Sequence, residues 1–243
     1  MGFVVLAIVV HPTVHSVGRK ALKGTIIAAS FPNGTILSVS TGFGAAVPVT
    51  AISNANPAVA TTATPPADGA IVVINSGWAG LTDRVARASA VDADSFALEG
   101  ISTLDTTRFD AGGGAGSYQS VSGWVQLSQV RETARAGGEQ QFFTWQYLED
   151  RDGRQRQKPT FKNAKSLTVT LDYDPALAWY DQLVGADESG NPVALRAVLP
   201  SGVSLYYYVY PSFDGDPSMT MNENMTNVAT FSMISPVIRY EAV

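Results

Sequence analysis

Hydrophobic and polar residues alternate over short runs along this chain, and turn-forming residues separate the runs. The runs are rich in Val, Ile, Thr and Tyr, which suit extended backbone, whereas Gly and Pro between them suit sharp reversals. The first predicted hairpin has one strand from residue 24 and another at 35–40, around the turn Pro32-Asn33-Gly34. The pattern therefore predicts a mainly β protein.

Residues 50–117 differ from the rest of the chain, being rich in Ala, Thr, Asp and Gly. Short apolar runs at 71–74, 85–88 and 95–98 are separated by turns, which is typical of a small β-barrel. The segment ends in a glycine-rich run at 112–117, and such runs often form flexible linkers. We therefore predict a separate barrel that ends in a flexible domain boundary.

More strands are predicted after this boundary. Residues 121–130 alternate imperfectly, as in a strand covered on both faces. Residues 140–148 and 166–173 are predicted to pair through a charged connection at 149–159, which is longer than a hairpin needs. Long loops in compact proteins are often functional or mobile. A β-meander completes the chain, with strands at 193–199, 203–210, 225–234 and 237–240.

One helix is predicted, beginning at Asp174-Pro175. Aspartate can cap free backbone amides, and proline at the first helical position loses no hydrogen bond. Leu177, Tyr180 and Val184 then fall on one side at helical spacing, and Gly185 can end the helix. We expect this short helix to pack on the sheet.

Composition restricts the classes of function. The chain of 243 residues is 45% hydrophobic and 15% charged, which is ample for a buried core. Its net charge of −5 disfavours tight wrapping around nucleic acid, and the absence of cysteine excludes disulfides and thiolate chemistry. The apolar run 3–10 is too short to span a bilayer, and basic residues follow it instead of preceding it. We expect no signal peptide and no membrane partner.

Candidate chemistry is sparse. His11 and His15 have the spacing of metal ligands on a helix, but Pro12 and the neighbouring β-branched residues disfavour that helix. The serine elbow of a hydrolase is missing, and the glycine run lacks the Gly-Lys-Ser/Thr of a phosphate-binding loop. We therefore predict no catalytic residue, no cofactor and no metal.

Two acidic pairs leave alternatives open. The pairs at 150/152 and 214/216 resemble parts of a calcium loop, but both lack the remaining ligands and the closing glutamate, so turn chemistry explains them. Paired acids could also act as general acid and base in a glycosidase, if two carboxyl groups converged in a cleft. The sequence alone does not exclude such an enzyme.

The tyrosine cluster at 206–208, with Tyr210, could stack on sugars or bases. In a strand these residues alternate between two faces, which predicts half of them in the core and half at a subunit contact.

Several stretches carry a family resemblance through their order and spacing. They lie at 124–130 (Trp-Val-Gln-Leu-Ser-Gln-Val), 137–142 (Gly-Gly-Glu-Gln-Gln-Phe), 148–159, 166–180 (ending Asp-Pro-Ala-Leu-Ala-Trp-Tyr), 195–202 and 219–240. In these stretches the chain resembles the major tail (tail tube) proteins of long non-contractile-tailed bacteriophages, the siphophages. Residues 50–117 are similar to a small β-barrel found as an accessory module in many phage structural proteins.

The resemblance implies a fold and a domain organisation. It implies a tail-tube β-sandwich or flattened barrel at 24–49 and 118–243, flanked by one α-helix. Residues 50–117 then form an inserted small β-barrel domain. An N-terminal arm at 1–23 has no counterpart in the family.

The resemblance also implies a non-enzymatic structural protein of the virion, made in the host cytoplasm. Its subunits would form hexameric rings that stack into a hollow tail tube, through which phage DNA passes without specific binding. The implied partners are further copies of this chain, a tape measure in the lumen, and the tail terminator and tip proteins. The alternative is a carbohydrate-binding or host-adsorption module of a phage tail.

The charged loop is the candidate site for contact with a neighbouring ring. We hypothesise inter-subunit contacts through its ionic side chains, although a solvated hairpin tip would explain the same composition. These side chains are Asp150, Arg151, Asp152, Arg154, Arg156 and Lys158.

Overall fold

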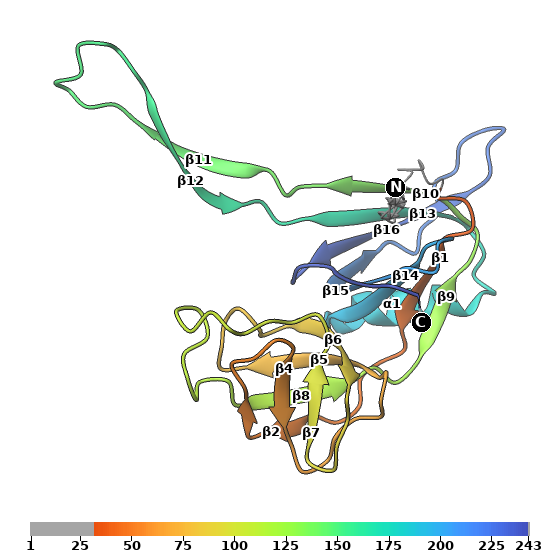
Figure 1. Ribbon diagram of the computed structural model, residues 1–243. Helices are drawn as coiled ribbons and strands as arrows, with labels where there is room; N and C mark the ends of the chain where they lie inside the picture. Colours follow the sequence, from red (N-terminus) through yellow and green to blue (C-terminus); the bar gives the residue numbers. More distant parts are fainter. Residues whose placement is uncertain (1–31, 243) are drawn as a thin grey trace, which may run out of the picture. The chain divides into compact units, whose positions relative to one another are not determined.

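The structure is a computed structural model that describes residues 32–242 (Figure 1). The predicted arm at 1–23, both histidines and the first strand of the predicted hairpin lie outside the described residues. The described chain is mainly β, as predicted, with three antiparallel sheets and one helix.

The largest sheet has eight strands in the order β10-β13-β16-β15-β14-β1-β9, with β17 paired to one edge of β15. The two end strands, β9 and β10, are separated in sequence only by Ser128 and Gln129, so the sheet curves back on itself. Gln129 has a positive φ of 61° at this reversal. The strands are β1 (Ile36–Ser40), β9 (Trp124–Leu127), β10 (Val130–Ala136), β13 (Ser166–Asp172), β14 (Val193–Val198), β15 (Ser204–Phe213), β16 (Thr226–Met233) and β17 (Ile238–Tyr240).

A second sheet has seven strands in the order β2-β8-β5-β6-β7-β4-β3. Its end strands β2 and β3 are joined by the single residue Thr50, which brings the two ends of the sheet together. The strands run beyond both predicted limits of the 50–117 segment, and the boundaries of an inserted domain remain a prediction. They are β2 (Val47–Val49), β3 (Ala51–Ile52), β4 (Ala58–Thr61), β5 (Ile71–Ser76), β6 (Arg84–Ser89), β7 (Ser95–Leu98) and β8 (Gly116–Ser120).

The glycine run at 112–117 is not a flexible linker. Gly116 begins strand β8, and the hydroxyl of Ser76 donates a hydrogen bond to the carbonyl of Gly114 across 3.0 Å. A Cβ at Gly114 would lie 2.8 Å from the Trp78 ring. Glycine is therefore needed here for close packing, which a composition rule cannot distinguish from flexibility.

Among the strands that the structure describes, β11 (Gln140–Trp145) and β12 (Arg156–Lys162) pair with each other and with no third strand. They form the two-stranded ribbon in Figure 1, which we call the hairpin together with its connection at 146–155. The predicted pairing of 140–148 with 166–173 is therefore wrong, because β13 pairs with β10 and β16. All seven residues of β12 are exposed, so it has no apolar alternation by which a strand could be recognised.

The helix α1 (Ala178–Ser189) contacts β15 and β9. It begins later than predicted, because the Asp174 carboxylate accepts a hydrogen bond from the Ala176 N–H within a preceding turn. It also passes through Gly185 and ends at Gly190, whose φ of 61° is left-handed. An Asp-Pro pair favours a turn as readily as a helix start, which explains the error.

Two hydrophobic cores lie on opposite faces of β15. Tyr207 packs with Trp179 and other residues of the helix and large sheet. Tyr206 and Tyr208 point the other way and pack with the buried residues of the small sheet. All three tyrosines are at most 8% exposed and lie in the two cores, whereas Tyr210 is 50% exposed and a subunit contact through it stays a prediction. The three buried rings are not available to a sugar, so within this cluster Tyr210 alone still supports the carbohydrate-binding alternative.

Candidate functional site

The hairpin exposes large apolar side chains. Phe142, Phe143 and Phe161 are 54%, 62% and 67% exposed, and Leu148 near the tip is fully exposed. The rings of Phe143 and Trp145 are stacked with their centroids 5.9 Å apart. Several large apolar side chains left exposed on one element mark a candidate site of interaction.

Cationic side chains share the hairpin with these rings. Phe143 lies opposite Lys158, and Trp145 opposite Arg156, so the two rings and the two cations lie on one face of the pair. The Arg156 guanidinium also lies 4.8 Å from the centre of the Tyr147 ring. Residues 140–162, which make up the hairpin, carry five basic and three acidic side chains, although the whole chain has a net charge of −5. The hairpin is thus an aromatic and basic element of an acidic protein.

The structure brings together only two of the residues predicted to contact another subunit. The guanidinium of Arg156 lies 3.4 Å from the Asp150 carboxylate, in an exposed pair of little energetic value. The other four, Arg151, Asp152, Arg154 and Lys158, are exposed and form no ion pair with any described residue. Sequence reasoning missed the aromatic side chains between which these charges lie. The signal was present in the adjacent Phe142 and Phe143 of the predicted strand at 140–148, but the long loop expected at 149–159 hid the partner strand β12.

A second exposed surface is the connection between β15 and β16. Residues 214–225, which we call the methionine loop, contain three acidic side chains and no Lys or Arg. Met219, Met221 and Met225 are 78%, 87% and 45% exposed. The Asp214 carboxylate accepts the Asp216 N–H across 3.0 Å, so this acidic pair forms a turn, as the sequence indicated.

An open pocket of about 560 Å³ lies beside the methionine loop, and we call it the acidic hollow. Three carboxylates line it, from Asp172, Asp174 and Glu223, together with Met225. Asp172 is already paired with Arg131 across 2.5 Å. Asp174 and Glu223 form no ion pair with any described residue, so the hollow can accept a cation.

Tyr240 of the large sheet lies against an ion pair formed by Arg87 and Glu99, beside the small sheet. Two guanidinium nitrogens of Arg87 donate to the Glu99 carboxylate across 2.5 and 2.6 Å, and the same guanidinium lies 4.4 Å from the centre of the Tyr240 ring. The hydrogen bonds from Arg87 lower the pKa of Glu99, and burial raises the pKa of Tyr240 to about 12. Arg87 and Glu99 are thus charged at neutral pH while Tyr240 stays protonated, as this contact requires.

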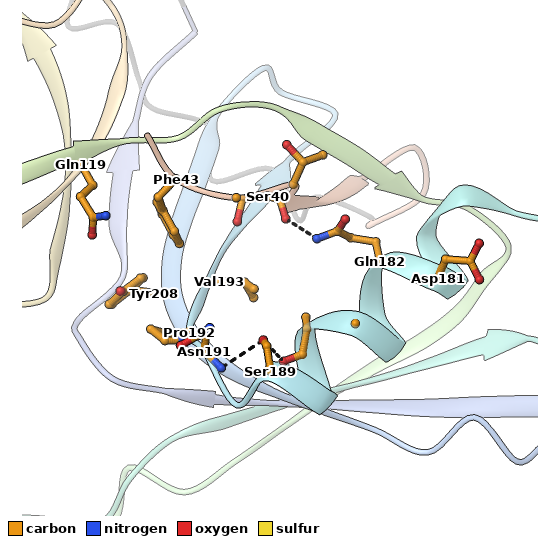
Figure 2. Close-up of a pocket in the computed structure, with 14 residues that line it drawn as sticks. Ser40, Phe43, Gln119, Asp181, Gln182, Ser189, Asn191, Pro192, Val193 and Tyr208 are labelled. Carbon is orange, nitrogen blue, oxygen red and sulfur yellow. Dashed lines mark hydrogen bonds between the residues drawn. The ribbon is translucent and has the colours of Figure 1, made fainter. Parts of the chain in front are cut away.

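Figure 2 shows another open pocket of about 560 Å³, between α1 and residues 40–43. The side-chain amide of Gln182 donates to the carbonyl of Ser40 across 3.1 Å. Asp181 is the single carboxylate in the lining, and burial raises the pKa of the Tyr208 hydroxyl there to about 12. A glycosidase needs two converging carboxyl groups, so this pocket does not supply the acid pair of that alternative.

Within residues 32–242, no three His, Asp or Glu side chains gather as a metal ion would require. The helix described in residues 32–242, α1, is not long and apolar enough to cross a membrane.

Comparison with solved structures gives distant likenesses. A chain in the virion of a native gene transfer agent (GTA) particle matches with a TM-score of 0.37 and 11% identity, covering 48% of this chain and 88% of that chain. A chain in the tail of an empty GTA particle matches with a TM-score of 0.39 and 10% identity, covering 49% and 88%. A chain in the cap of the anti-feeding prophage tube matches with a TM-score of 0.34 and 20% identity, covering 48% and 83%. A search of curated proteins found no match.

Comparison with protein families gives a match over most of the chain. A family model described as phage tail tube protein (TTP) matches residues 76–242. The matched segment includes the hairpin, the helix and the methionine loop. Because it makes up more than half of the chain, this protein belongs to the phage tail tube protein family and is a structural, non-enzymatic component of the virion tail.

Proposed function

We propose that this protein assembles into hexameric rings, that the rings stack into the hollow tube of a siphophage tail, and that phage DNA passes through the tube. One observation carries the assembly: the hairpin exposes aromatic and basic side chains that the described part of its own chain leaves uncovered. An isolated two-stranded ribbon is only marginally stable in water. Contact with another subunit would bury these side chains and stabilise the ribbon.

The contact within a ring uses the free edge of β10. Among the described strands β10 pairs only with β13, and six of its seven residues are exposed. An unpaired edge has a row of free N–H and C=O groups that another chain can satisfy. A ring also requires a heterologous contact, in which this edge meets a different surface of the next subunit.

Stacking of the rings then follows from the direction of the strands. If neighbouring subunits meet along β10, the strands of the sheet run across the ring and their ends point towards the adjacent rings. The hairpin extends from the end of β10 and the beginning of β13, so it reaches out of its own ring. We propose that the six charged residues from Asp150 to Lys158 contact the adjacent ring together with the aromatic side chains.

The charge of the protein suits a passage for DNA. Carboxylates on a lumen wall repel phosphate, whereas a basic wall would hold DNA through the release of counterions. The net charge of −5, together with the concentration of basic residues in the hairpin, supports a wall that DNA can pass without being retained.

The remaining expectations are part of the same proposal. Residues 50–117 form an inserted domain on the outside of the tube, which is supported by the separate seven-stranded sheet to which most of this segment contributes. The tape measure, the tail terminator and the tip proteins are the other partners, and the subunit is made in the host cytoplasm before assembly.

The test is negative-stain electron microscopy of the purified protein at rising concentration. One variant replaces residues 146–155 with Asn-Gly, a two-residue turn that keeps Trp145 opposite Arg156. A second variant exchanges the signs of four tip charges without changing their sum, by substituting Asp150→Lys, Arg151→Glu, Asp152→Lys and Arg154→Glu. We expect tubes from the wild type and unstacked rings or free subunits from both variants.

Circular dichroism and thermal unfolding of the free subunits provide the control, because both changes lie outside the two hydrophobic cores. Normal stacking by the charge-exchanged variant would refute the role of the charges. A wild-type protein that stays monomeric even when seeded with preformed tail tips would refute assembly into a tube.

A further inference from the structure

We propose that the methionine loop, with the acidic hollow beside it, is the docking site for the hairpin of a second copy of this chain in the adjacent ring. This inference rests on the proposed function and names the surface that receives the hairpin. It follows from where the two surfaces lie in the sheet, from their apolar side chains and from their charges.

The two surfaces lie at opposite ends of β13. At one end Ser166 pairs with Ala136 of β10, next to the base of the hairpin. At the other end Asp172 pairs with Thr226 of β16, next to the methionine loop. Strand β13 has seven residues and spans about 20 Å, so the two surfaces face opposite sides of any ring in which the strands cross the ring plane. In a stack of identical rings, each hairpin therefore faces a methionine loop.

The apolar side chains of the two surfaces suit each other. The hairpin contributes Phe142, Phe143 and Leu148, each more than half exposed. The loop contributes Met219 and Met221, each more than three-quarters exposed. Methionine is flexible and polarizable and makes favourable contacts with aromatic rings, so it can adapt to a partner surface. Docking removes both sets of side chains from water in one contact.

The charges of the two surfaces are opposite. The charged side chains of the methionine loop are all acidic. In the acidic hollow, Asp174 and Glu223 have no ion-pair partner among the described residues. At the hairpin tip, Arg151 and Arg154 are exposed cations that likewise have no ion-pair partner among the described residues. A guanidinium can donate two hydrogen bonds to one carboxylate, so an arginine of the tip fits the hollow better than a lysine would.

The absence of cysteine allows a direct test. Tubes of a double variant, Leu148→Cys with Met221→Cys, are oxidised and separated on a non-reducing gel. Because each subunit then carries one cysteine on each surface, docking links subunits head to tail, and we expect a ladder of multimers that a reductant collapses. The matched control is Leu148→Cys with Asp68→Cys, which places the second thiol on an exposed turn of the small sheet.

A second measurement uses the wild-type chain and does not depend on the folding of a variant. Peroxide oxidation of Met219 and Met221 is followed by mass spectrometry in free subunits and in tubes. We expect oxidation to be several-fold slower in tubes, because docking covers both side chains. Tubes that form normally, give no more ladder than the control pair and oxidise at the rate of free subunits would overturn this inference and leave the proposed function intact. A failure of the wild type to form rings or tubes would count against the proposed function itself.

Discussion

The hydroxyl of Tyr240 donates a hydrogen bond to the backbone carbonyl of Glu99 across 2.9 Å, and it accepts one from the backbone N–H of Arg87 across 2.8 Å. Tyr240 belongs to the large sheet, whereas Arg87 belongs to the small one and Glu99 directly follows its strand β7. One side chain thus satisfies a donor and an acceptor of the small sheet while its ring packs in that sheet's core. The small sheet is held by specific contacts and is not merely tethered.

Tyr240→Phe keeps this packing and removes both hydrogen bonds. We expect the free energy of unfolding of the free subunit to fall by about 1–3 kcal/mol, because a buried donor and acceptor lose their partner. Urea denaturation measures this change. The matched control is Tyr210→Phe, since Tyr210 is half exposed, and its change should stay within about 0.5 kcal/mol. Equal effects of the two substitutions would contradict the prediction.

The Arg87–Glu99 pair should make the stability of the free subunit depend on pH in the acid range. Arg87 lowers the pKa of Glu99 from its ordinary value of 4.5, so the pair stabilises the fold above that value. This stabilisation is lost as pH falls from 4.5 through the lower pKa of the folded state. The excess stability of the wild type over Glu99→Gln should therefore shrink as pH is lowered from about 6 to about 3.

Urea denaturation across this pH range tests the dependence, with Glu188→Gln as the control because Glu188 is exposed on the helix. A difference between wild type and Glu99→Gln that stayed constant with pH would show that the ionised carboxylate does not stabilise the contact.

Two glycine substitutions should have opposite effects on the free subunit. In Gly114→Ala the new Cβ would lie 2.8 Å from the Trp78 ring, so we expect a loss of about 1–3 kcal/mol. Gly185 lies inside α1 with no atom within 4 Å of an added Cβ, and Gly185→Ala should gain about 0.5–1 kcal/mol. Thermal unfolding distinguishes the two. A neutral Gly114→Ala would restore the linker interpretation of the glycine run.

Phe143→Ser should separate folding from assembly. The side chain is 62% exposed, so the stability of the free subunit should change by at most about 0.5 kcal/mol. The rings of subunits should fail to stack into tubes, because the hairpin loses one aromatic side chain of the Phe143–Trp145 pair. Tube lengths in electron micrographs measure the effect. Leu104→Ser is the control, since Leu104 is 61% exposed on a different surface, and its tubes should match the wild type. Tubes of equal length from both variants would exclude Phe143 from the contact.

The sequence predicted the mainly β class because strands such as β13 alternate regularly between apolar and polar residues. It missed β12, where no residue is buried and the strand exists through its pairing with β11. Alternation of apolar and polar residues reveals a strand when one of its faces is buried. It cannot reveal an exposed strand that is stabilised by pairing with one neighbour.

The candidate site was found only in part for a related reason. The tip charges are visible in the sequence, but the opposition of the hairpin and the methionine loop depends on the pairing of β13 with both β10 and β16. The burial of Tyr206 and Tyr208 likewise depends on small-sheet residues more than a hundred positions away. No local pattern contains such relationships.

The placement of the hairpin and the methionine loop at opposite ends of β13 makes each subunit directional. If the hairpin docks on the methionine loop as we propose, a tube built from such subunits has polarity: one terminus presents uncovered aromatic and basic hairpins, and the other presents uncovered methionine loops with their acidic hollows. A protein that begins the tube and a protein that stops it must then have opposite surface chemistry. A single kind of subunit would thereby make the two termini of the tube bind different proteins, and the tube would grow in one direction.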